Sequence, residues 1–249
     1  MGEYQMRLAA RREIARGTMA CWFDTNGARY EFRAGQHADF AFCDPGQGDK
    51  NGDNVRTFSL ASSPQEKKSI MVAMRMRESG FKTALKATPI GTMFGVSGPR
   101  GSFTLHKDFA RPAVFLAGGI GITPMHSILH TAVYGGLPHK LYLFYANREP
   151  ADVTFLAELE GLAVRNRSFI LVPTITKSIN SAWRYQKGHI DGNLLAQYLA
   201  GFSGPVYYVA GPSGMVAATT EMLQAAGVSE DDIKTEEFGD YKAGPPNQP

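Results

Sequence analysis

The glycine-rich segment Gly118–Pro124 (GGIGITP) has the residue types of a phosphate-binding turn. It follows the apolar run Ala113–Ala117 and precedes a helical stretch, so its glycines would bring a ligand close to the N–H groups of a helix N-terminus. Pro124 suits the first turn of that helix, where its missing N–H costs little. The spacing departs from Gly-x-Gly-x-x-Gly, so a turn that only permits tight packing of strand on helix remains an alternative.

A second segment, Arg56-Thr57-Phe58-Ser59, could bind a flat, phosphate-bearing cofactor. In an extended strand Arg56, Phe58 and Leu60 face one way, whereas Thr57 and Ser59 face the other. The guanidinium of Arg56 could pair with a phosphate while the ring of Phe58 stacks on the cofactor. An ordinary strand with a core phenylalanine and a surface arginine is the alternative.

Two further segments are expected at helix starts. Gly80–Thr83 opens a short helix and offers backbone N–H groups, a hydroxyl and a lysine to an anion, although a simple N-terminal cap would have the same residues. Ala210–Met215 follows a strand at the sheet edge where open α/β sheets bind ligands, although a plain strand-to-helix turn is the alternative. One dinucleotide-type site in each half of the chain suggests two cofactors that meet between the halves.

The first hundred residues are typical of short β-strands. The expected strands Tyr30–Phe32, His37–Phe42, Arg56–Ala61 and Ile70–Arg77 are separated by Gly, Pro, Asn and Asp. Within Ile70–Arg77 apolar residues alternate, so one face should point inward while the other ends in two arginines. This pattern predicts a small barrel or sandwich.

The rest of the chain alternates strands with helices, which predicts a doubly wound parallel sheet. We expect strands at Ala113–Ala117, Leu141–Tyr145, Phe169–Val172, Val206–Val209 and Ile233–Phe238, and helices at Thr123–Val133, Phe155–Ala163, Leu194–Leu199 and Met215–Ala226. The change of pattern falls within Phe103–Pro112, which divides the chain into domains at 1–108 and 109–249.

Composition narrows the class of protein. The 249 residues are 43% hydrophobic and carry a net charge of +3, too weak to indicate a nucleic-acid partner. Cys21 and Cys43 cannot supply the roughly four thiolates of an iron–sulfur cluster, and so few cysteines suit the cytoplasm. No stretch reaches the roughly 20 apolar residues of a membrane helix, and Met1–Gly17 lacks a signal-peptide core. His126 and His130 have metal-ligand spacing but no third ligand, so we expect no metal site.

The order of these motifs resembles that of the ferredoxin–NADP(+) reductase superfamily along essentially the whole chain. Family members carry Arg-x-Tyr/Phe-Ser in a flavin-binding β-barrel, then Gly-Gly-x-Gly-x-Thr-Pro in a nicotinamide domain, then Cys-Gly-Pro and a terminal aromatic segment. The counterparts here are Arg56–Ser59, Gly118–Pro124, Ala210–Pro212 and Glu236–Phe238. The resemblance implies an N-terminal antiparallel six-stranded flavin-binding β-barrel followed by a doubly wound parallel-sheet nicotinamide-binding domain, with no iron–sulfur domain.

The resemblance also implies roles for the matched residues. Ser59 would hydrogen-bond the flavin N5, Glu236 would be the family acid near the nicotinamide, and Phe238 would cover one flavin face. Arg75 would lie along the ribityl chain. The expected cofactor-binding residues are Arg56, Thr57, Phe58, Ser59, Val72, Met74, Arg75, Gly80, Phe81, Lys82, Thr83, Gly118, Gly119, Gly121, Ile122, Thr123, Pro124, Asn147, Arg148, Gly211, Pro212, Met215 and Phe238, with Ser59, Glu236 and Phe238 as the catalytic group.

The implied activity is a flavoprotein reductase that accepts hydride from NADPH or NADH onto FAD, with FMN also compatible. It would pass single electrons to a separate protein acceptor, either a ferredoxin, a flavodoxin or an oxygenase component. Arg148 and Lys177 follow two neighbouring strands and favour NADPH.

Two departures from the family pattern keep other functions open. Phe58 stands where tyrosine is commoner, which could weaken flavin retention and would suit a free-flavin reductase or diaphorase. Ala210 stands where the family often has a cysteine beside the nicotinamide, which would suit a redox-silent nucleotide-sensing adaptor.

Overall fold

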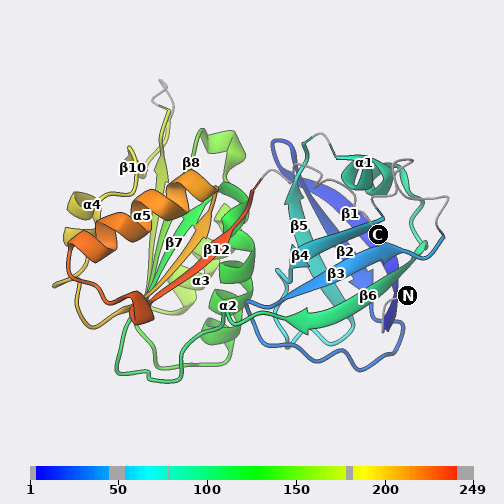
Figure 1. Cartoon of the computed structure of the whole chain (residues 1–249), viewed down its shortest axis with the longest axis horizontal. Coiled ribbons are helices and arrows are strands. Elements are labelled where there is room, and N and C mark those ends of the chain that lie inside the picture. The colour runs from blue at the N-terminus through cyan, green and yellow to red at the C-terminus, as the bar shows by residue number, and fades with distance from the viewer. Residues whose placement is uncertain (1–3, 45–53, 78, 178–181, 240–249) are drawn as a thin grey trace, which may run out of the picture.

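Two six-stranded sheets, one antiparallel and one parallel, make up the chain in the computed structural model (Figure 1). The structure describes residues 4–44, 54–77, 79–177 and 182–239. The antiparallel sheet comes first along the chain and the parallel sheet second, so the predicted fold class is confirmed.

The antiparallel sheet closes into a barrel. Its strands are β1 (Tyr4–Ala15), β2 (Thr18–Asp24), β3 (His37–Phe42), β4 (Val55–Ser59), β5 (Ser69–Arg75) and β6 (Met93–Arg100), in the order β4-β3-β6-β1-β2-β5. A bridge between Leu60 and Val72 joins the two edge strands, and the Ala61 N–H donates to the Met71 carbonyl at 2.8 Å. Helix α1 (Gly80–Ala87) connects β5 to β6 and buries Phe81 and Leu85 against the barrel core.

Two barrel features differ from the sequence predictions. Tyr30–Phe32 lies in the β2–β3 connection and is not a strand, because its aromatic rings pack on the barrel without joining a ladder. The ring of Tyr30 meets that of Tyr4 edge-on at 5.0 Å. Strand β5 is buried on both faces. Ile70, Val72 and Met74 line the barrel core, whereas Met71 and Ala73 pack toward the second sheet.

The parallel sheet is covered by helices on both faces, which explains its continuous apolar strands. Its strands are β7 (Ala113–Gly118), β8 (Leu141–Asn147), β9 (Phe169–Ile175), β10 (Gln186–Lys187), β11 (Val206–Gly211) and β12 (Ile233–Glu237), in the order β10-β9-β8-β7-β11-β12. Helices α2 (Ile122–Tyr134) and α3 (Leu156–Arg165) cover one face, and α4 (Gly192–Ala196) and α5 (Ser213–Ala225) cover the other. Short 3-10 turns lie at Gly119–Gly121, Pro150–Asp152 and Glu230–Asp232.

The strand order reverses between β7 and β11, and this reversal brings the loops that follow them side by side. The two-residue strand β10 was not predicted, because so short an edge strand has no periodic pattern. Helix α4 begins earlier than predicted, at Gly192, since the Asp191 side chain caps it by accepting from the Leu194 N–H at 2.8 Å.

Helix α2 lies between the two sheets (Figure 1). One apolar cluster runs through this interface and joins Ala20, Ala61 and Met71 of the barrel side to Met125 and Ile128 of α2. The two halves therefore share a buried core in addition to their own. Within the described residues, no helix combines the length and the apolar character needed to cross a membrane.

Candidate functional site

The loops after β7 and β11 pack directly against each other. A Cβ atom on Gly118 would lie 2.3 Å from the Met215 Sδ, and one on Gly121 would lie 2.3 Å from the Ala210 carbonyl oxygen. A Cβ on Gly211 would lie 3.1 Å from the Gly118 Cα. Close packing of strand and helix therefore accounts for these three glycines.

Gly119 differs from its neighbours. It has φ +54° and its side-chain position is open, since no atom lies within 4 Å of a Cβ built there. The 3-10 turn Gly119–Gly121 leads into α2, which has no side-chain cap, and α5 begins beside it at Ser213, also with no side-chain cap. Two helix N-termini without side-chain caps thus meet at the strand-order reversal, an arrangement suited to an anion such as a pyrophosphate.

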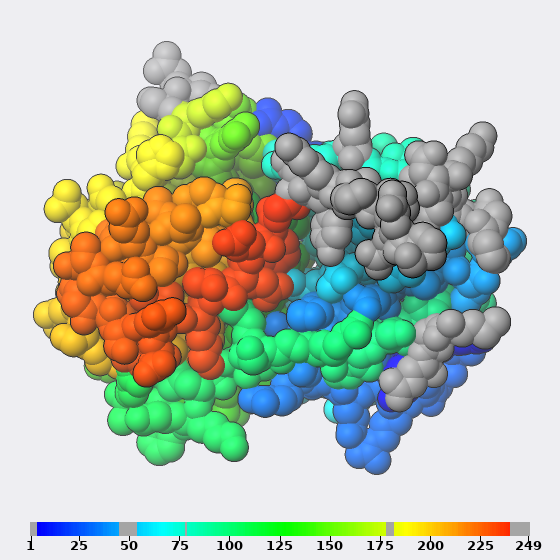
Figure 2. Space-filling model, in the orientation of Figure 1, coloured from blue at the N-terminus to red at the C-terminus, as the bar shows by residue number. Residues whose placement is uncertain are grey.

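The three residues predicted as catalytic come together at this edge of the sheet. The Ser59 hydroxyl at the end of β4 donates to Glu236 Oε1 of β12 at 2.8 Å, across the interface between the sheets. Glu236 pairs with Ala210 in the β11–β12 ladder, and the Phe238 N–H donates to the Gly211 carbonyl at 2.9 Å. Figure 2 shows this last strand, in red, beside the junction of the two halves.

Burial governs the electrostatics of this contact. Ser59 is 4% exposed. Burial raises the pKa of Glu236, and the hydrogen bond from Ser59 offsets part of that rise. The carboxyl of Glu236 is therefore a group that can retain a proton at higher pH than an exposed glutamate.

The remaining residues of the β4 motif take different positions. The Thr57 hydroxyl points outward and donates to Asp39 Oδ1 at 2.6 Å. The Arg56 guanidinium donates to the Val55 carbonyl at 3.1 Å. Phe58 is 8% exposed and its ring lies 5.8 Å from that of Phe40, on the barrel-core side. Stacking of Phe58 on a cofactor ring stays a prediction.

Three of the residues predicted to bind a cofactor direct their side chains into the barrel core. Those of Val72, Met74 and Phe81 are at most 2% exposed and belong to the barrel core. Strand alternation and the inward face of α1 direct them away from the interface, so any contact with a cofactor would come from their backbone. At the start of α1 the Ser79 side chain accepts from the Lys82 N–H, and the Lys82 ammonium donates to the Arg75 carbonyl at 3.0 Å.

Arg75, which was predicted to lie along a ribityl chain, forms an ion pair in this structure. Its guanidinium donates to Asp152 Oδ1 of the parallel-sheet half at 3.1 Å. Arg16 binds the same oxygen at 2.9 Å and pairs with Glu149 at 2.8 Å. The sequence analysis missed Asp152, because nothing local marks an acid that pairs with residues so distant in the chain.

Asn147 and Arg148 lie where β8 ends, beside the end of β9. The Lys177 N–H donates to the Arg148 carbonyl at 3.0 Å, and the Thr176 N–H donates to the Asn147 carbonyl at 2.9 Å. The Asn147 Nδ2 is buried without a hydrogen-bond partner in the described part of the chain. An unsatisfied buried donor at a ligand-binding edge is compatible with a polar ligand group.

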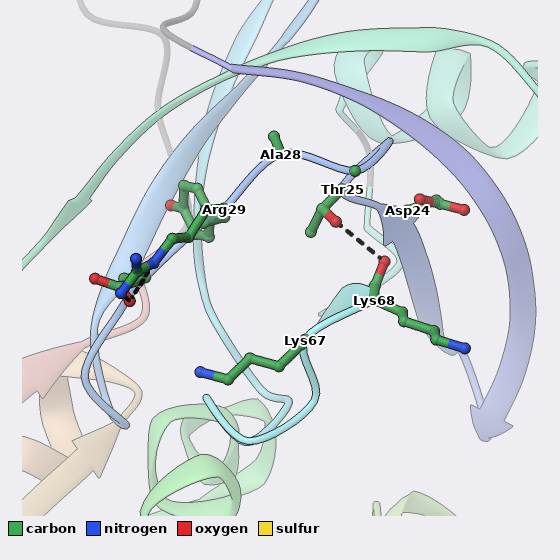
Figure 3. Close-up of a pocket in the computed structure, with 9 residues that line it drawn as sticks. Asp24, Thr25, Ala28, Arg29, Lys67 and Lys68 are labelled. Atoms are coloured by element: carbon green, nitrogen blue, oxygen red, sulfur yellow. Dashed lines mark hydrogen bonds and ion pairs between the residues drawn. The ribbon is translucent and has the colours of Figure 1, made fainter.

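A cavity of about 540 Å³ opens elsewhere on the barrel, between the β2–β3 and β4–β5 connections (Figure 3). Its lining residues are Asp24, Thr25, Gly27, Ala28, Arg29, Tyr30, Glu31, Lys67 and Lys68. The Thr25 hydroxyl donates to the Lys68 carbonyl at 3.4 Å within it. None of the predicted site residues lines this cavity. Among the residues that the structure describes, no group of three or more His, Cys, Asp or Glu could hold a metal ion.

Comparison with known proteins gives one family model and several relatives. The model described as "Oxidoreductase NAD-binding domain" matches residues 115–221. The chain is 29% identical over 210 residues to the reductase component of phenol 2-monooxygenase from Pseudomonas sp. (strain CF600), covering 83% of this chain and 58% of that protein. It is 26% identical over 243 residues to ferredoxin–NADP reductase B of Sorangium cellulosum, covering 94% and 97%. The chain thus spans less than two thirds of the monooxygenase reductase.

The fold also matches solved structures. The flavohem-like FAD/NAD binding domain of nitric oxide dioxygenase from Vibrio cholerae superposes with a TM-score of 0.83 at 19% identity, covering 96% of this chain and 100% of that one. At this level of identity the match shows a shared two-sheet fold.

Proposed function

We propose that the chain is a flavoprotein reductase of the ferredoxin–NADP(+) reductase superfamily that takes hydride from NAD(P)H and passes single electrons to a separate protein. The observation that carries this proposal is the hydrogen bond of 2.8 Å between Ser59 and Glu236 across the interface. It joins the barrel to the parallel sheet beside two uncapped helix N-termini. A boundary between 108 and 109 would separate the two binding domains.

The residues present fit both cofactors. The open backbone at Gly119 and the N-termini of α2 and α5 would hold the pyrophosphate of NAD(P)H. Arg56 and the start of α1 at Gly80 would hold the phosphates of FAD. Bound flavin supplies the chemistry that side chains lack, because it accepts a hydride and releases electrons one at a time.

The chain's own side chains would orient the reactants and manage a proton. The Ser59 hydroxyl is a donor held at the interface, and it would point to flavin N5 in the family pattern. The buried carboxyl of Glu236 accepts from Ser59 and can hold a proton, since burial raises its pKa. Phe238, anchored by its backbone to Gly211, would cover the flavin face and exclude water.

NADPH is the proposed donor in preference to NADH. Arg148 and Lys177 are adjacent at the ends of β8 and β9, and both are exposed cations. Glu149, the nearby acid, is paired with Arg16 at 2.8 Å and with Lys177 at 3.8 Å, which lowers its repulsion of a 2′-phosphate. We expect the proposed reductase to bind NADPH more tightly than NADH.

The proposed acceptor is a protein with a one-electron centre, such as a ferredoxin, a flavodoxin or an oxygenase component. The relative from Pseudomonas is named as a monooxygenase reductase component, and the relative from Sorangium as a ferredoxin–NADP reductase. Both names support transfer to a partner protein.

An anaerobic absorbance titration tests the proposal. Protein purified with FAD is titrated with NADPH and then, in a separate sample, with NADH, and ferricyanide or cytochrome c is added afterwards. Bleaching of the flavin bands followed by reduction of the acceptor supports the reductase. Flavin that binds but does not bleach would favour a nucleotide-sensing adaptor, and a chain that binds no flavin would overturn the assignment of the barrel.

A further inference from the structure

Helix α2 is hydrogen-bonded to three consecutive residues of the barrel half. His126 Nδ1 lies 2.7 Å from the Ala61 carbonyl oxygen, and the Ser127 hydroxyl donates to the Ser62 carbonyl at 2.6 Å. The Thr131 and Ser63 hydroxyls are 3.0 Å apart. The three barrel residues follow Ser59 closely along the chain, and the same helix begins at the glycine loop. One rigid element thus connects both halves of the proposed site (Figure 1).

His126 is the unusual member of this contact because both of its ring nitrogens face acceptors. Nδ1 faces the Ala61 carbonyl, and Nε2 lies 3.0 Å from Glu158 Oε2 of α3. A carbonyl oxygen cannot donate, so Nδ1 must carry a hydrogen, and a carboxylate at Nε2 requires a second one. An imidazole that donates from both nitrogens is positively charged.

The ring of His126 is only 3% exposed. It pairs with Glu158, and the hydrogen bond with His126 is the main reason that the pKa of Glu158 lies below its usual range. The ring of Phe155 stacks on His126 with centroids 4.1 Å apart. Phe155 holds φ +60°, a backbone conformation that bulky residues seldom adopt, and that conformation carries its ring into this contact.

We propose that doubly protonated His126 is a positioning residue that clamps α2 to the backbone following Ser59 and thereby fixes the nicotinamide site relative to the flavin site. This inference rests on the proposed function. One buried histidine would thus control the alignment of the nicotinamide ring with the flavin ring, and the rate of hydride transfer depends steeply on that alignment. Loss of one proton from the ring would remove a donor from the Ala61 or the Glu158 contact.

Three further titratable groups lie around the His126–Glu158 pair. His130 lies one turn further along α2, with its ring centroid 5.5 Å from that of His126. Burial, and after it the charge of His126, lower the pKa of His130. Glu66 of the β4–β5 connection faces His130, and Arg12 of β1 faces Glu158.

The first test compares His126→Gln with His130→Gln in anaerobic stopped-flow reduction of the bound flavin by NADPH. His126→Gln keeps one donor but no charge, and we expect the limiting reduction rate to fall about tenfold or more while the apparent Kd for NADPH stays within about twofold. Glu158→Gln, on a half-exposed side chain, should have a smaller effect in the same direction. His130→Gln should reduce at the wild-type rate.

The same variants separate positioning from a general structural role, because His130 lies on the same helix one turn away. A wild-type rate for His126→Gln, or an equal loss in His130→Gln, would overturn the proposal.

Nitrogen NMR of ¹⁵N-histidine-labelled wild-type holoprotein shows which ring nitrogens of His126 carry a hydrogen, and it needs no turnover. Two protonated ring nitrogens on His126 at neutral pH, absent in His126→Gln spectra, support the clamp, and a neutral ring overturns it. If NADPH and NADH fail to reduce the wild-type flavin, the reductase proposal falls and the role in hydride transfer falls with it. The NMR signature then still decides whether His126 joins the two halves as an imidazolium.

Discussion

The proposed site has two sides that are built by opposite means. On the parallel-sheet side its shape comes from missing side chains, since Gly118, Gly121 and Gly211 fit backbone and Met215 into the space where a Cβ would lie. On the barrel side it comes from polar side chains that cross the interface, as Ser59 does to Glu236.

The two sides of the site should therefore control different properties of the protein. A substitution at the glycine loops adds atoms where none fit, so it should change the free energy of unfolding. A substitution at the Ser59–Glu236 contact removes a polar group at the interface between the sheets. It should therefore change the rate of flavin reduction more than the free energy of unfolding. Five variants test this contrast.

Gly121→Ala should have the largest effect. Its Cβ would lie 2.3 Å from the Ala210 carbonyl oxygen and 2.6 Å from the Gly211 nitrogen, and backbone atoms cannot move aside as a side chain can. We expect a loss of about 3 kcal/mol in the free energy of unfolding, measured by urea denaturation. Gly161→Ala in α3 is the matched control, since no atom lies within 4 Å of its Cβ. Equal stability of the two variants would break the contrast.

What could be predicted from the sequence also differs between the parallel-sheet side and the barrel side. The glycine motif and the alternating strands and helices of the second half were predictable because they depend on local patterns such as Ala113–Ala117 before Gly118. The resemblance assigned Ser59 and Glu236 to one catalytic group, and the structure brings their side chains within 2.8 Å of each other.

The features that the sequence did not predict depend on tertiary contacts. Arg75 binds Asp152 of the other half, a pairing that no local spacing encodes. Val72 and Met74 carry a correct strand pattern, but the pattern does not say which face meets a cofactor. His126 was considered only as a metal ligand, since its partners Ala61 and Glu158 meet it only in the folded chain.

Glu236→Gln and Ser59→Ala should have the next largest effect, and on rate. We expect each to slow flavin reduction by NADPH about ten- to a hundredfold, measured by anaerobic stopped flow. The free energy of unfolding of Glu236→Gln at neutral pH should equal or exceed that of the wild type. Burial raises the pKa of Glu236, so its ionisation destabilises the folded state as the pH rises above the unfolded value.

Glu237→Gln is the control for these two variants, because Glu237 is the next residue of β12 and is exposed. It should leave both rate and stability unchanged. A stability loss in Glu236→Gln comparable with that of Gly121→Ala would mean that the contact between Ser59 and Glu236 also contributes to packing.

Asp152→Asn should have a smaller effect, on stability and its pH dependence. Burial alone would raise the pKa of Asp152, but the hydrogen bonds and charges of Arg75 and Arg16 outweigh it and the pKa is lowered. The stabilisation is therefore present above the unfolded pKa of about 3.9 and is lost as the pH falls through the lower folded value. We expect a loss of about 1 kcal/mol at pH 7, since both arginines are partly exposed.

Thermal unfolding from pH 7 down to pH 2 measures this effect. The difference between wild type and Asp152→Asn should shrink toward acid pH, whereas Asp231→Asn, at an exposed aspartate, should follow the wild type throughout. A difference that is constant with pH would show that the ion pairs do not link the halves electrostatically.

Gly214→Ala should have the smallest effect and of opposite sign to Gly121→Ala. Gly214 lies in the first turn of α5, its φ is not positive, and no atom lies within 4 Å of its Cβ. Alanine there should stabilise the fold by about 0.4–1 kcal/mol, because it restricts the unfolded chain.

The added methyl group would occupy the space through which a pyrophosphate reaches the helix N-terminus, so the Kd for NADPH should rise. Gly192→Ala in α4 has the same open surroundings away from the strand-order reversal, and it should gain stability with no change in Kd. Equal NADPH binding by both variants would place the nucleotide away from α5 and leave α2 alone to bind its phosphates.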